Sequence, residues 1–134
     1  MTPNAEPAAR LSGMIVYCCA DLIFATKIRS TCEALGVVSR PARNAEMLQK
    51  RLDRVNDSKP NDAVSLVLID LDIGADALGL IAMARSHDAA LPVIAWGPHI
   101  AVELLNKASA AGASQVMTRG SFTQQLPESL RSAQ

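Results

Sequence analysis

The chain has 134 residues, of which 49% are hydrophobic and 19% charged, which is enough apolar material for one domain with a buried core. Its 13 basic and 13 acidic side chains balance, so electrostatics give no reason to expect nucleic acid or an anionic membrane as a partner. No apolar run approaches the length of a membrane span, and the run at 14–19 is too short and too poorly flanked for a signal peptide. We therefore expect a cytoplasmic protein.

Residues 1–13 contain two prolines and show no hydrophobic period, which is typical of a disordered tail. In the expected domain, 14–134, short apolar runs alternate with amphipathic segments. Strands are predicted at 14–19, 37–39, 64–69, 93–96 and 116–118, and helices at 22–35, 45–55, 77–86, 100–111 and 122–131. The polar segment 56–62 is predicted to be a loop. Pro127 is expected in the first turn of the last helix rather than in its interior.

Capping residues mark where several of these helices begin and end. Asp21, Asn44 and Asp76 are predicted N-caps, because a short polar side chain can accept hydrogen bonds from the first amides of a helix. Gly36 and Gly112 follow the first and fourth helices and are predicted to end them.

The third predicted strand carries the strongest signal in the chain. Residues 63–72 read A-V-S-L-V-L-I-D-L-D, and such an apolar run is typical of a strand buried on both faces of a parallel sheet. The alternation of strands and helices predicts an α/β fold with helices on both faces of a five-stranded parallel sheet in the flavodoxin-like order 2-1-3-4-5. Functional residues of such sheets lie just past the carboxyl ends of the strands, where Asp70 and Asp72 fall.

Three segments resemble the receiver domain of two-component response regulators, the CheY-like family. They are V-L-I-D-L-D at 67–72, L-P-V-I-A-W-G at 91–97 and A-A-G-A-S-Q-V-M at 110–117. The resemblance covers nearly everything from 14 to 131. It implies a (βα)5 domain that works in signalling.

The resemblance also implies a role for Asp70, whose position is that of the aspartate that accepts a phosphoryl group in the family. Mg²⁺ offsets the charge of the transferring group, and the family keeps an acidic pair at the end of strand one to hold it. Cys19 and Ala20 occupy those positions here, and Asp21 falls one residue later. Asp21, Asp70 and Asp72 are thus candidate ligands of a weakly bound Mg²⁺, Asp72 through its backbone carbonyl, and no other cofactor is expected. The alternative for Asp72 is that it only begins the loop after the strand.

Two further positions depart from the family pattern. Where the family has a Ser or Thr hydroxyl and a lysine to contact the phosphoryl group, this chain has Gly97 and Arg119. By position, Arg119 and Gly97 are the candidates to contact phosphate or a carboxylate. Arg119 can also hold the Asp70 carboxylate permanently, and a solvated loop arginine is an equally weighted alternative. These departures indicate a degenerate receiver, or pseudo-receiver.

Several of these residues also have a purely structural explanation. Asp70 can be a strand-end carboxylate that accepts hydrogen bonds from loop amides, and Asp21 is better explained as an N-cap than as a metal ligand. Trp96 is best explained as a core aromatic. Cys18 and Cys19 face opposite sides of a strand, so we interpret them as small buried hydrophobes rather than a redox or metal pair.

The fourth predicted helix is apolar almost all the way round, although packing on one sheet needs only an apolar stripe. The excess predicts a second buried face, against a protein partner or in a homodimer. The alternative is that small alanines are tolerated on a solvated face. The candidate interface residues are Ile100, Ala101, Leu104, Ala108 and Ala111.

Three functions remain open from the sequence. The first is a stand-alone, non-enzymatic signalling domain that acts through protein–protein contacts without normal Mg²⁺-dependent phosphorylation. The second is an active receiver phosphorylated on Asp70 by a histidine kinase. The third is a flavodoxin-like binder of a small molecule, although C-C-A-D-L-I-F after the first strand lacks the glycines of a phosphate-binding turn.

Overall fold

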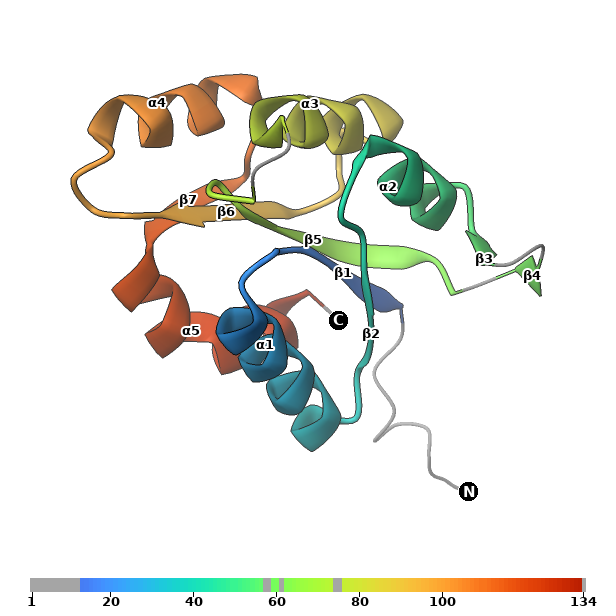
Figure 1. The fold of residues 1–134 in the computed structure, drawn as a ribbon. Coiled ribbons are helices and arrows are strands. Elements are labelled where there is room, and N and C mark those ends of the chain that lie inside the picture. Colours follow the sequence, from blue (N-terminus) through green and yellow to red (C-terminus); the bar gives the residue numbers. More distant parts are fainter. Residues whose placement is uncertain (1–12, 57–58, 61, 74–75, 134) are drawn as a thin grey trace.

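The computed structural model describes residues 13–56, 59–60, 62–73 and 76–133. Its central feature is a five-stranded sheet in the order β2-β1-β5-β6-β7, and every neighbouring pair of strands is parallel (Figure 1). The strands are β1 (Met14–Cys18), β2 (Val38–Pro41), β5 (Val64–Asp70), β6 (Val93–Gly97) and β7 (Gln115–Thr118). β5, β6 and β7 are the third, fourth and fifth predicted strands, because β3 (Val55–Asn56) and β4 (Lys59–Pro60) belong to a separate small sheet. The predicted order 2-1-3-4-5 is therefore confirmed. Apart from Gly13, the predicted tail lies outside the described residues.

Five helices cover the two faces of this sheet (Figure 1). They are α1 (Leu22–Leu35), α2 (Ala45–Leu52), α3 (Ala77–His87), α4 (Val102–Ala111) and α5 (Arg119–Ser132). α1 and α5 pack on one face, and α2, α3 and α4 pack on the other. Among the described residues, none of the helices has the length and apolar character needed to cross a membrane.

The predicted caps are confirmed, because they depend on contacts close in sequence. Asp21, Asn44 and Asp76 each accept a hydrogen bond from a backbone amide in the first turn of α1, α2 and α3 respectively. Gly36 and Gly112 follow α1 and α4 with φ of 73° and 119°. This left-handed conformation favours glycine and ends a helix.

Three predicted boundaries were wrong. α2 ends at Leu52 rather than at 55, because Arg54 has φ of 66°, and β3 (Val55–Asn56) then pairs antiparallel with β4 (Lys59–Pro60) in the segment expected to be a loop. α4 begins at Val102 rather than at 100. α5 begins at Arg119, capped by the Thr118 hydroxyl, so Pro127 lies in its interior and not in its first turn.

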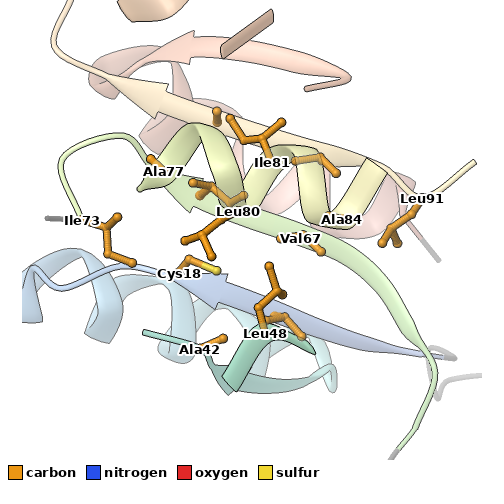
Figure 2. Packing of buried hydrophobic residues seen from close by; sticks show 14 of the residues in the cluster. Cys18, Ala42, Leu48, Val67, Ile73, Ala77, Leu80, Ile81, Ala84 and Leu91 are labelled. Atoms are coloured by element: carbon orange, nitrogen blue, oxygen red, sulfur yellow. The ribbon is translucent and has the colours of Figure 1, made fainter. Parts of the chain in front are cut away.

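Two apolar clusters, one on each face of the sheet, hold the helices in place. Figure 2 shows the first cluster, in which Leu48 of α2 and Ile81 of α3 lie over Val67 of β5 and Cys18 of β1. The second cluster joins α1 and α5 to the opposite face. The buried Trp96 lies in this second cluster, as predicted, with its ring stacked 3.9 Å from Phe122.

Candidate functional site

Asp70, the last residue of β5, lies at the carboxyl edge of the sheet and is only 2% exposed. Its Oδ1 accepts a hydrogen bond from the backbone amide of Asp72 at 2.9 Å. Its Oδ2 accepts a hydrogen bond from the thiol of Cys19 at 3.6 Å. The carboxylate therefore has a donor on each oxygen, one from the following loop and one from the end of the neighbouring strand β1.

Burial raises the pKa of Asp70 above its ordinary value, because it disfavours the charged form of the carboxyl group. The Asp72 amide, the Cys19 thiol and the nearby charge of Arg119 act in the opposite direction, and the charge of Asp72 adds to the rise. Burial has the largest effect, so Asp70 holds its proton more strongly than an exposed aspartate does.

Cys19 occupies a position for which the receiver resemblance implies a carboxylate. Burial first, and then the charge of Asp70 among other causes, raises the pKa of its thiol to about 12. The sulfur therefore carries a proton at neutral pH, and it is a hydrogen-bond donor rather than a thiolate ligand. Cys18 lies in the cluster on the opposite face of the sheet, which confirms that the two thiols do not face each other.

Asp21 is engaged with the helix that follows it. Its Oδ1 accepts hydrogen bonds from the amides of Ile23 at 2.8 Å and Phe24 at 3.2 Å. Both amides are among the unpaired donors of the first turn of α1. The interpretation of Asp21 as an N-cap is confirmed, and its capping oxygen already has two donors.

Arg119 pairs with Asp72, and the structure shows no ion pair between Arg119 and Asp70 among the residues that it describes. Nη2 of Arg119 lies 2.6 Å from Oδ2 of Asp72, and both side chains are about two-fifths exposed, at 41% and 44%. The guanidinium carbon also lies 6.0 Å from the ring centroid of Phe24. Of the two equally weighted interpretations of Arg119, neither a hold on Asp70 nor a wholly solvated side chain describes it, because its carboxylate partner is Asp72. Its positive charge still lowers the pKa of Asp70.

Gly97 ends β6, where the family resemblance implies a hydroxyl. A Cβ at this position would lie 3.3 Å from the side chain of Leu71 and 3.6 Å from that of Leu105. A serine or threonine would therefore require the Leu71 side chain to shift by a few tenths of an ångström, whereas its distance to Leu105 is an ordinary contact. The glycine has no side-chain hydroxyl that could donate a hydrogen bond to a phosphoryl oxygen, so only its backbone amide remains as a donor.

The three candidate Mg²⁺ ligands do not form a ligand set. Asp21 caps α1, Asp70 accepts from a thiol and an amide, and Asp72 pairs with Arg119. Within the described ranges, no group of three or more His, Cys, Asp or Glu side chains is placed to hold a metal ion. Mg²⁺ requires a near-octahedral shell of oxygens, and the donors present do not fit it.

The candidate interface residues are unequally exposed. Ile100 is 79% exposed and the neighbouring Val102 60%, whereas Ala101 is half-buried at the N-cap of α4. Leu104 and Ala111 are partly buried and pack against the core. Ala108 is fully buried in that core, so its assignment to an interface was wrong: it lies on the face of α4 that contacts the rest of the domain.

Sequence reasoning missed the two contacts that define this site, Cys19 to Asp70 and Arg119 to Asp72. Both join residues far apart in the chain. One signal was available: Cys19 follows β1, and β1 neighbours β5 in the predicted order, so the two strand ends had to be adjacent.

No protein-family model and no curated protein sequence matches this chain. Its fold is that of response regulator receiver domains. It is similar to a response regulator from Thermotoga maritima, with 19% identity, a TM-score of 0.72 and coverage of 92% of this chain and 98% of that one. The receiver domain of NtrX from Brucella abortus is 18% identical, with a TM-score of 0.71 and coverage of 89% of this chain and 96% of that one. A CheY-like receiver domain protein from Methanospirillum hungatei is 18% identical, with a TM-score of 0.72 and coverage of 91% of this chain and 93% of that one.

Proposed function

We propose that this chain is a receiver-like domain of two-component signalling that acts in the cytoplasm by binding another protein. We further propose that Mg²⁺-dependent phosphorylation of Asp70 does not control it. The fold and the names of its structural neighbours support the first part. The hydrogen bond from the Cys19 thiol to Asp70 is the observation that carries the second part.

Phosphoryl transfer to a carboxylate needs a cation that offsets the negative charge of the transferring group. A protonated thiol at Oδ2 of Asp70 neither binds Mg²⁺ nor supplies positive charge. Asp21 would have to give up two helix amides to become a ligand, and the Asp72 side chain already pairs with Arg119, which leaves only its backbone carbonyl as a candidate. The site therefore does not favour phosphoryl transfer to Asp70, and we assign no catalytic residue. It favours a role in which the domain binds another protein.

The test is a set of amide NMR spectra recorded with Mg²⁺ and then with Mg²⁺ and beryllofluoride, a mimic of the aspartyl phosphate. We expect no shifts centred on Asp70, Asp72 and Arg119. Asp70→Asn is the matched control, because it keeps the size of the side chain and removes the acceptor. Shifts in the unchanged protein that are absent from Asp70→Asn would overturn the proposal and favour an active receiver that takes its phosphoryl group from a histidine kinase.

For the protein contact, we propose the exposed start of α4, with Ile100 and Val102 at its centre, as a homodimer surface. A charge at Leu104 would not test this surface, because Leu104 packs against the core. Ile100→Glu does test it, since this side chain is 79% exposed. Light scattering across a concentration series should show a lower mass for Ile100→Glu, with Ala110→Glu on the exposed side of α4 as the control. The same mass for all three proteins at every concentration would overturn the proposed dimer.

A further inference from the structure

A cavity lies at the carboxyl edge of the sheet, lined by residues of β1, of α1 and of the end of β2. Its volume is about 230 Å³. Its walls come from the end of β1, from one side of α1 and from the segment after β2. The lining residues are Tyr17, Cys19, Ala20, Leu22, Ala25, Arg29, Pro41 and Arg43.

The walls of this cavity are fixed by the fold. Leu22, Ala25 and Arg29 are spaced by three and four residues, so they lie on one side of α1. The amide of Ala42 donates to the carbonyl of Tyr17 at 3.0 Å, and this bond holds the segment after β2 against the end of β1. The cavity is therefore part of the folded domain and not a gap between mobile loops.

The charged side chains that line the cavity are all positive. Its two charged lining residues are Arg29 and Arg43, and no Asp or Glu is among the described residues that line it. Within the described part of the chain, neither arginine has a hydrogen bond or an ion pair with another side chain. Two like charges at one cavity repel each other, and an anion between them would replace repulsion by attraction.

The rest of the lining is largely apolar. Leu22, Ala25 and Pro41 offer carbon surface, and the buried Tyr17 and Cys19 line the cavity beside them. The volume lies below the roughly 300–1,000 Å³ of typical pockets for drug-sized ligands, which is small for a nucleotide or a flavin. Such a site suits a small molecule with one charged end.

We propose that this cavity binds a small organic anion: a carboxylate or phosphate head group between Arg29 and Arg43, on a short apolar body that lies against Leu22 and Pro41. Planar guanidinium groups suit both head groups, because they can donate two parallel hydrogen bonds. The proposed anion site shares Cys19 with the proposed signalling site, but it uses neither the oxygens of Asp70 nor the surface of α4.

The test is an amide NMR titration of the full chain with butyl phosphate, sodium butyrate and inorganic phosphate at constant ionic strength. We expect saturable shifts at Tyr17, Ala20 and Arg43 with butyl phosphate or butyrate, and weaker binding of inorganic phosphate, which lacks the apolar body. The tighter of the two organic probes identifies the head group, and either one supports the proposal. Because no Mg²⁺ or beryllofluoride is used, this proposal and the signalling proposal fail separately.

Arg29→Gln and Arg43→Gln should each weaken binding about tenfold, because each removes a charged donor. Arg40→Gln is the matched control: Arg40 is exposed nearby on β2 but does not line the cavity. All three arginines are exposed, so the variants should keep the wild-type spectrum without ligand. Shifts that do not saturate with any probe would overturn the proposal. So would equal binding of phosphate and butyl phosphate, or unchanged affinity in both cavity variants.

Discussion

Replacing Asp70 by asparagine should stabilise the folded protein at neutral pH. The asparagine keeps the shape of the side chain, and its Oδ1 can still accept from the Asp72 amide, as Asp70 does at 2.9 Å. Its Nδ2 would face the sulfur of Cys19, a weak hydrogen-bond acceptor. The Cys19 thiol could then donate to the carbonyl oxygen of Asp21, which lies 3.5 Å from the sulfur. The substitution therefore removes a buried negative charge and leaves Nδ2 with a weak acceptor.

The direction of this effect follows from the pKa of Asp70, which burial raises above the ordinary value of 3.8. A raised pKa in the folded state means that folding favours the protonated form, so the wild type loses stability as the pH rises through that pKa. Asparagine does not ionise and avoids this loss. We expect Asp70→Asn to have the higher unfolding free energy at pH 7, and each kcal/mol of gain raises Tm by about 3–5 °C for a domain of this size.

Urea denaturation of both proteins between pH 3.5 and 8 measures this effect. The difference in unfolding free energy between the two proteins should increase as the pH rises from 3.8. It should then become constant above the pKa of Asp70 in the folded protein. Asp72→Asn is the control, because it removes an exposed carboxylate that pairs with Arg119 and should lower stability by less than about 1 kcal/mol. An Asp70→Asn variant that is less stable at pH 7, or a difference that is the same at pH 3.5 and pH 7, would refute the reasoning.

Three further outcomes can be measured. Phe122→Ala should lower the unfolding free energy by about 3–5 kcal/mol in urea denaturation, because Phe122 is buried and stacks on Trp96; a loss near zero would contradict this packing. Iodoacetamide at pH 8 should modify Cys19 at least about a hundredfold more slowly in the folded than in the denatured chain, because burial raises the pKa of its thiol to about 12. Peptide mass mapping measures both rates, and equal rates would contradict this prediction. Arg119→Gln should cost less than about 1 kcal/mol, and the cost should shrink in 1 M salt, since its pair with Asp72 is exposed; a salt-independent loss would count against the ion pair.

The sequence alone was sufficient for the order of the strands and for most helix ends. The apolar run before Asp70 predicts a strand covered on both faces, and alternation with amphipathic segments leaves few topologies. Asp21, Asn44 and Gly36 were correctly predicted because a cap contacts amides or carbonyls only a few residues away. The start of α5 was missed, because Pro127 suggested a later first turn although the packing of Phe122 and the Thr118 cap extend the helix on both sides of it.

The chemical state of the site was decided by the tertiary structure. Sequence reasoning placed Asp70 and Arg119 at one sheet edge and allowed a pair between them, but Arg119 reaches Asp72 instead. It weighed Cys19 as a substitution in a metal pocket, but not as the donor that faces Asp70. The cavity at Arg29 and Arg43 likewise depends on how α1 lies against β2. Caps and strand patterns arise from neighbours along the chain, whereas these contacts depend on side-chain directions that exist only after helices and strands have packed.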